Sequence, residues 1–164
     1  PDGPGGCARG RVRRRTPVRT IQRIIVHHSA GSDTETVDQV RAFHVKTRGY
    51  SDIGYHWIIR RLFKGGPWVV AQGRPEEATG AHDQGQNADS LGICLLGDYT
   101  KNPVDPDAWL VLVALIANRC RAYNLGFVAV EGHRENEPAN TPTACPGFDP
   151  HLLRVAVAEH MDNG

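Results

Sequence analysis

Three side chains that favour zinc stand at separate places along the chain: His27 in IIVHHSAG, His133 in VEGHRE and Cys145 in TPTACPG. Two imidazoles and one thiolate are donors that Zn²⁺ prefers, and three protein ligands leave a fourth coordination position for water, as in catalytic zinc sites. A lone histidine at the end of a strand is more often structural, and such long spacings are not a local zinc signature. Taken together, the three residues indicate a metal-dependent enzyme.

Residues beside the two histidines are candidates for supporting roles. His28 is expected to face away from the side of the sheet that His27 faces, because successive strand side chains alternate. Glu131 is either a base or ligand-supporting group, or simply a charge at a solvated strand edge. Glu135 is expected to hold a ligand histidine in one tautomer, as outer-shell carboxylates do.

Apolar runs and caps predict the elements that position these residues. Short alternating or β-branched runs indicate strands, and capping residues followed by apolar stripes indicate helices. Strands are expected at 24–28, 53–63, 68–72, 90–97 and 127–133, and helices at 37–47, 106–123 and 148–161. The fold class that follows is α/β, with a mixed central β-sheet of about five to six strands flanked by about three helices.

Several boundaries have specific signals. Asp105 and Pro106 predict the N-cap and first position of a long helix, which Gly126 can close. The near-continuous apolar run 90–97 predicts a central strand covered on both faces. Residues 73–89 lack periodicity, which predicts an irregular segment long enough to be functional.

Charge divides the chain unevenly. Seven arginines and one aspartate lie within residues 1–23, a local charge of +6, whereas the whole chain carries +1. We therefore expect a basic, flexible N-terminal extension over 1–21 and a folded domain over 22–164. The extension is expected to attract anionic polymers, although a solvated leader is the simpler alternative.

Membrane and export signals are weak in this sequence. The chain lacks an apolar run long enough for a membrane span, and its N-terminus lacks the apolar stretch of a signal peptide. Four cysteines are too few for a disulfide scaffold, and Cys94 and Cys120 lie in apolar runs as small buried hydrophobes. Cys145, in a Pro/Thr-rich loop, is better placed to be a ligand.

Four ordered blocks resemble a known family: IIVHHSAG, GYSDIGYHWIIRR, TGAHDQGQNADSLGICLLGDY and GHRENEPANTPTACPG. In this order they look like the zinc-dependent N-acetylmuramoyl-L-alanine amidases of type 2, which include phage endolysins and peptidoglycan recognition proteins. The resemblance covers roughly residues 22–158. It implies a phage-type lytic enzyme acting on peptidoglycan, present in the host cytoplasm until release to the wall, or secreted if not phage-derived.

The resemblance also implies roles for particular residues. His27, His133 and Cys145 would be the zinc ligands, and Tyr55 would be the catalytic tyrosine. Thr143 stands where some phage enzymes have lysine, so it can donate a hydrogen bond but cannot supply a lysine's charge. Three further residues would line the groove for muramyl peptide, namely His44, His82 and Asn87.

Alternatives remain for the groove residues and for the function. His44 could instead cover a helix face, and Asn87 could cap a turn. A non-catalytic peptidoglycan-binding module is the main alternative to an amidase, and retention of Cys145 favours the enzyme. A nucleic-acid binder is not expected, because the body is acidic and no nucleic-acid motif accompanies the tail. The protein is expected to be a monomer.

Overall fold

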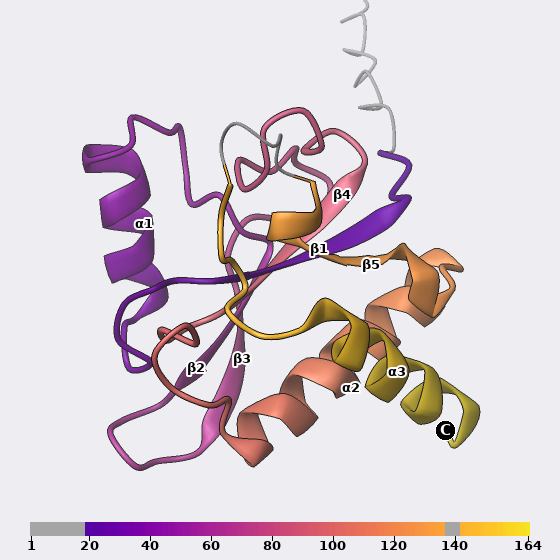
Figure 1. The fold of residues 1–164 in the computed structure, drawn as a ribbon. Coiled ribbons are helices and arrows are strands. Elements are labelled where there is room, and N and C mark those ends of the chain that lie inside the picture. Colours follow the sequence, from indigo (N-terminus) through magenta and orange to yellow (C-terminus); the bar gives the residue numbers. More distant parts are fainter. Residues whose placement is uncertain (1–18, 137–141) are drawn as a thin grey trace, which may run out of the picture.

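A single five-stranded sheet organises the computed structural model, which describes residues 19–136 and 142–164. Its strands lie in the order β3-β2-β4-β1-β5 (Figure 1). They are β1 (Arg23–His28), β2 (Trp57–Arg61), β3 (Trp68–Gln72), β4 (Ser90–Leu95) and β5 (Val130–Gly132). β4 pairs in parallel with β1 and β2, β1 pairs in parallel with β5, and β2 and β3 form an antiparallel hairpin.

Three α-helices cover the two faces of this sheet. They are α1 (Val37–Lys46), α2 (Pro106–Tyr123) and α3 (Pro150–Asp162). Figure 1 shows α2 and α3 side by side, with α1 well apart from them. The predicted mixed α/β class, with its central sheet and flanking helices, is confirmed.

Alternation along the strands assigns side chains to two cores. Ile24 and Val26 of β1, with Ile93 of β4, belong to the larger core beneath α2 and α3. On the other face, Ile58 of β2 and Cys94 of β4 pack with the α1 residue Val40 in a smaller core. All six residues of β4 are buried, as a central strand covered on both faces requires. Fewer apolar side chains therefore pack on the α1 side of the sheet, and this side leaves room for a cavity.

Helix ends follow the predicted caps at the N-terminus of α2. The Asp105 side chain accepts hydrogen bonds from the first turn, and Pro106 occupies the first helical position. Such a cap stabilises a helix by about 1 kcal/mol. At the other end α2 stops at Tyr123, as predicted, but the residue that closes it is Asn124, with φ of 54°, and not Gly126. Asparagine is one of the residues that tolerates the left-handed conformation.

Three predicted strands are shorter than their apolar runs, and one of them is β4, which ends at Leu95 rather than at residue 97. β2 begins at Trp57 rather than at residue 53, and β5 contains only Val130–Gly132. Residues on both sides of β5 form 3₁₀ turns, η1 (Phe127–Ala129) and η2 (His133–Glu135). The Glu135 carboxylate accepts the Gly132 N–H at 2.7 Å, so the chain turns there instead of continuing the strand.

The first described residues contact the body. Ile21 is buried in the larger core, and the Arg19 side chain reaches carbonyl groups of the 73–90 region. Residues 1–18, which hold most of the predicted basic extension, lie outside the described residues. Within the described ranges, no helix is both long enough and apolar enough to cross a membrane.

Candidate active site

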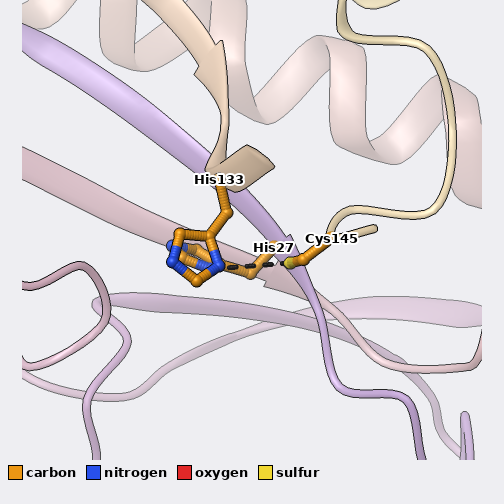
Figure 2. Close-up of side chains that lie close together, drawn as sticks. All are labelled: His27, His133 and Cys145. Atoms are coloured by element: carbon orange, nitrogen blue, oxygen red, sulfur yellow. Dashed lines mark hydrogen bonds between the residues drawn. The ribbon is translucent and has the colours of Figure 1, made fainter. Parts of the chain in front are cut away.

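His27, His133 and Cys145 lie together at one edge of the sheet (Figure 2). One donor atom from each residue lies within 4.8 Å of the other two. The Sγ atom of Cys145 is 3.7 Å from Nδ1 of His27. His27 is 1% exposed and Cys145 is 7% exposed, so both donors are shielded from bulk water.

Parallel pairing explains why two distant histidines meet. Val26 pairs with Gly132, so β1 and β5 end at the same edge of the sheet. His27 lies near the end of β1, and His133 begins the turn directly after β5. The sequence placed His133 on the strand itself, and the turn instead swings its imidazole towards His27.

Three hydrogen bonds order the cysteine loop, and two of them hold it against β1 and η2. The Arg134 N–H donates to the Cys145 carbonyl at 2.8 Å. The Cys145 N–H donates to Oγ1 of Thr143 at 3.2 Å. The His28 N–H donates to the Cys145 sulfur at 3.3 Å.

The donor set fits a zinc ion. Ordinary Zn–S and Zn–N bonds at tetrahedral angles separate a sulfur and a nitrogen ligand by about 3.6 Å, close to the observed separation. Burial lowers the pKa of His27 well below its ordinary value, so the ring is neutral and keeps a lone pair for a metal. The three residues could therefore hold zinc without rearrangement of the backbone.

Tyr55 and His44 form the wall beside this donor group. The Tyr55 ring centroid lies 5.3 Å from that of His27 and 5.2 Å from that of His44. Burial raises the pKa of Tyr55 well above its ordinary value, so its hydroxyl remains protonated and can donate a hydrogen bond. His44 is held in place because its Nδ1 accepts the Gly54 N–H at 2.9 Å.

Of the other two predicted groove residues, the structure places His82 in the cavity wall and Asn87 outside it. His82 lines the cavity, and its Nδ1 lies 3.1 Å from Nε2 of His27. Asn87, which the sequence predicts to line the groove, is not part of that lining. Its Oδ1 accepts the N–H groups of His82 and Asp83 at 2.8 and 3.1 Å. Asn87 thus caps the turn that carries His82, the alternative the sequence left open.

A cavity of about 520 Å³ opens over the donor group. Thr143 lines it, together with the three donor residues and with Tyr55, His44 and His82. The lining residues that were not singled out from the sequence include Glu35, Phe43, Arg48 and Tyr50. The spacing of four between Val40, His44 and Arg48 was a usable signal, because such residues share one side of a helix.

The three residues that stand near the two histidines in the sequence, His28, Glu131 and Glu135, have structural partners. The His28 ring accepts the Tyr99 N–H at 3.3 Å, on the side of the larger core. Glu131 pairs with Arg23 at 3.8 Å, away from the cavity. Glu135 forms a two-pronged ion pair with Arg154 at 2.8 and 3.0 Å. Glu135 therefore shapes the turn that carries His133.

Known proteins are similar to this chain in sequence and in architecture. The sequence model of the N-acetylmuramoyl-L-alanine amidase family matches residues 17–148. The endolysin of Klebsiella phage KP32 is 36% identical over 141 residues, covering 82% of this chain and 85% of that protein. Peptidoglycan-recognition protein SC1a/b of Drosophila simulans is 33% identical over 132 residues, covering 75% and 66%.

A solved structure supports the same relationship. The N-acetylmuramoyl-L-alanine amidase LysC from Clostridium intestinale URNW superposes with a TM-score of 0.70 and 30% sequence identity. The superposition covers 83% of this chain and 84% of that one.

Proposed function

Because the chain belongs to the type 2 N-acetylmuramoyl-L-alanine amidase family, we propose that it is a zinc-dependent, phage-type lytic enzyme. The family makes it a peptidoglycan amidase. The bond that we propose it cleaves is the amide between the lactyl group of N-acetylmuramic acid and L-alanine of the stem peptide. Muramyl peptide would occupy the cavity over the three clustered donors, lined by His44 and His82.

The observation that carries this proposal is the grouping of His27, His133 and Cys145 at the floor of the cavity. When bound there, zinc supplies a Lewis acid that polarises a carbonyl and activates water at neutral pH. The two imidazoles and the sulfur would hold the ion, and the hydrogen bond from the His28 N–H would stabilise the sulfur as a ligand.

Tyr55 and Thr143 have complementary roles in this proposal. The protonated phenol of Tyr55 donates a hydrogen bond to the substrate oxygen on which negative charge develops. The Thr143 oxygen accepts the Cys145 N–H, which leaves its hydroxyl hydrogen to donate into the cavity. Neither side chain brings a positive charge, so both would act through hydrogen bonds alone.

Purified peptidoglycan provides the test of reaction and metal together. The wild-type protein is expected to contain about one zinc ion per chain. It should release stem peptides with new L-alanine amino termini and no new reducing sugar ends. A Cys145→Ser variant should lose zinc and activity beyond the roughly 10–100-fold cost of losing an outer partner.

Cys120→Ser serves as the matched control, because Cys120 is also buried but lies in the larger core. This variant should retain zinc and hydrolysis. A wild-type protein that binds peptidoglycan and zinc but releases no peptide would instead be a recognition module. New reducing ends would identify a glycosidase and overturn the proposal.

We also propose that the arginine-rich residues 1–18 bind anionic polymers of the cell envelope. A truncation should stop before Arg19, because that side chain bonds to the folded body. Removing residues 1–18 should reduce lysis of cells that have an outer membrane more than it reduces hydrolysis of purified peptidoglycan. Equal loss of both activities would contradict an envelope-binding role.

A further inference from the structure

A row of hydrogen bonds leads away from His27 on the side opposite Cys145. Nε2 of His27 lies 3.1 Å from Nδ1 of His82. Nε2 of His82 lies 3.4 Å from Oγ of Ser90, whose hydroxyl donates to the Gln86 carbonyl at 2.6 Å. Ser90 is fully buried at the start of β4, so water does not compete for its hydroxyl.

The last bond in this row sets the direction of the others. Serine has a single hydroxyl hydrogen, and here the Gln86 carbonyl receives it. The Ser90 oxygen can therefore only accept from His82, which requires the hydrogen of the His82 ring to be on Nε2. A neutral imidazole has one N–H, so Nδ1 of His82 accepts from Nε2 of His27. Nδ1 of His27 is then left without a hydrogen, and it faces the sulfur of Cys145.

The fold also fixes the plane of the His82 ring. A Cβ atom at Gly80 would lie 2.5 Å from Cδ2 of His82, and one at Gly92 would lie 2.4 Å from the same atom. The two glycines therefore leave a narrow space that the His82 ring fills, and a side chain at either position would collide with the ring. Asn87 holds the backbone of His82 from outside this space.

We propose that His82 and Ser90 are positioning residues that fix the tautomer of His27, so that Nδ1 of His27 is the atom offered to the metal. This inference rests on the proposed zinc site and adds how one ligand is oriented. His82 acts through His27 rather than only on substrate. Ser90, which the sequence shows only as the polar start of an apolar strand, sets the direction of the row.

Asparagine and leucine at position 82 separate this role from a steric one. The two side chains have nearly the same shape, but only asparagine offers an oxygen near the place of the His82 Nδ1 atom. His82→Leu is expected to weaken zinc binding about 10–100-fold, in the range found for outer-shell partners. His82→Asn should bind zinc nearly as tightly as the wild-type protein. Equal zinc affinity in His82→Leu and the wild type would overturn the proposal.

Nitrogen-15 NMR of the histidine rings tests the direction of the bonds in the wild-type protein, independently of whether any variant folds. His27 and His82 should both carry their hydrogen on Nε2 in the zinc-free protein. Ser90→Ala should allow the other tautomer of His82 to appear. Finding His82 with its hydrogen on Nδ1 in the wild type would overturn the relay. A wild-type protein that binds no zinc would instead overturn the proposed function, so the two failures are distinguishable.

Discussion

Tyr55 shows how its surroundings decide what one side chain can do. A phenol is a weak base at neutral pH, and burial beside the imidazole of His27 raises its pKa further. The hydroxyl is therefore a hydrogen-bond donor throughout the working range. A donor aimed at a developing negative charge helps most in the transition state and little in substrate binding.

Replacing this hydroxyl should slow the chemical step selectively. Tyr55→Phe is expected to lower kcat about 10²–10³-fold, the cost of removing one donor to a developing oxyanion, with little change in KM. Zinc content should remain that of the wild type. Tyr50→Phe is the control, because Tyr50 lines the same cavity from the segment after α1 and contacts the His44 ring. A Tyr55→Phe enzyme with wild-type kcat would exclude the donor role.

Residue types predicted the three clustered donor residues better than they predicted the residues that hold the donors in place. His27, His133 and Cys145 were recognisable because few side chains suit zinc, and the structure brings them together. Ser90 was not recognisable, because its importance comes from the direction of a single hydrogen bond. Asn87 was placed in the groove by resemblance, although its amide oxygen is used by backbone N–H groups.

At the scale of elements, the irregular segment 73–89 is held in part by a half-buried cation, Arg19. The Arg19 guanidinium donates to five backbone carbonyls, at distances between 2.6 and 3.2 Å, of Glu76, Ala78, Asn87, Ala88 and Ser90. Five donors in a planar fork suit arginine and no other side chain. The segment that carries His82 is therefore rigid despite its lack of helix or strand.

Substituting lysine for this arginine should loosen the segment. An ammonium group has three donors, so Arg19→Lys leaves carbonyls unsatisfied and should cost about 1–3 kcal/mol of unfolding free energy. Amide hydrogen exchange should accelerate across 73–89 while α2 and α3 exchange as in the wild type. Arg60→Lys is the control, because the hydrogen bonds of Arg60 within the described part of the chain go to the nearby carbonyls of Arg61 and Leu62. Unchanged exchange in 73–89 would show that other contacts hold the segment.

A second contact ties the same segment to α2 and β2. The Glu76 carboxylate accepts hydrogen bonds from Trp57 and Tyr123, and it pairs with Arg119 at 3.3 Å. Although burial alone would raise the pKa of Glu76, the donated hydrogen bonds and the positive charge together lower it below its ordinary 4.5. A lowered pKa means that this carboxylate stabilises the fold above pH 4.5, and that the stabilisation is lost as the pH falls through the folded-state pKa.

Glu76→Gln should therefore destabilise the protein in a pH-dependent way. At pH 7 the loss should be about 1–3 kcal/mol, because a charged acceptor with three partners is removed. Near pH 4 and below, the difference from wild type should shrink, since the wild-type carboxylate becomes protonated. Urea unfolding at both pH values measures the two differences. Glu77→Gln, at an exposed neighbouring position, should change neither, and a constant gap for Glu76→Gln would contradict the argument.

Element boundaries show where sequence patterns stop being informative. Apolar periodicity and Asp-Pro caps predicted the three helices well, because these signals are local. The ends of β2 and β5 were not predicted, because pairing and side-chain bonds end those strands. In β5, the Glu135 carboxylate intercepts the Gly132 N–H, and no run of apolar letters records such a bond.

At the scale of the whole molecule, the metal donors join parts of the chain that are otherwise linked through the sheet. His27 belongs to β1, His133 to the turn after β5, and Cys145 to the loop before α3. The parallel β1–β5 pair that brings the histidines together was implied only in general terms by strands alternating with helices. The exact strand order needed the three-dimensional fold, since many orders satisfy the same alternation.

Removing zinc should loosen this junction and lower overall stability. A ligand at 100 times its dissociation constant stabilises the folded state by about 2.7 kcal/mol, which corresponds to roughly 5–10 °C in unfolding temperature for a domain of this size. Thermal unfolding with and without a chelator measures the shift. The Cys145→Ser variant should unfold at the same temperature in both conditions. A wild-type protein that also shows no shift would argue against a metal that bridges the three segments.

The order of the three donors along the chain has a consequence for synthesis. A ribosome makes both histidines before it makes Cys145, and the sulfur reaches them only after the loop ahead of α3 has left the exit tunnel. A nascent chain can thus assemble most of its sheet while its reactive centre is still incomplete. The three donors can therefore meet only after the synthesis of the sheet strands, because Cys145 follows the last of them in the chain.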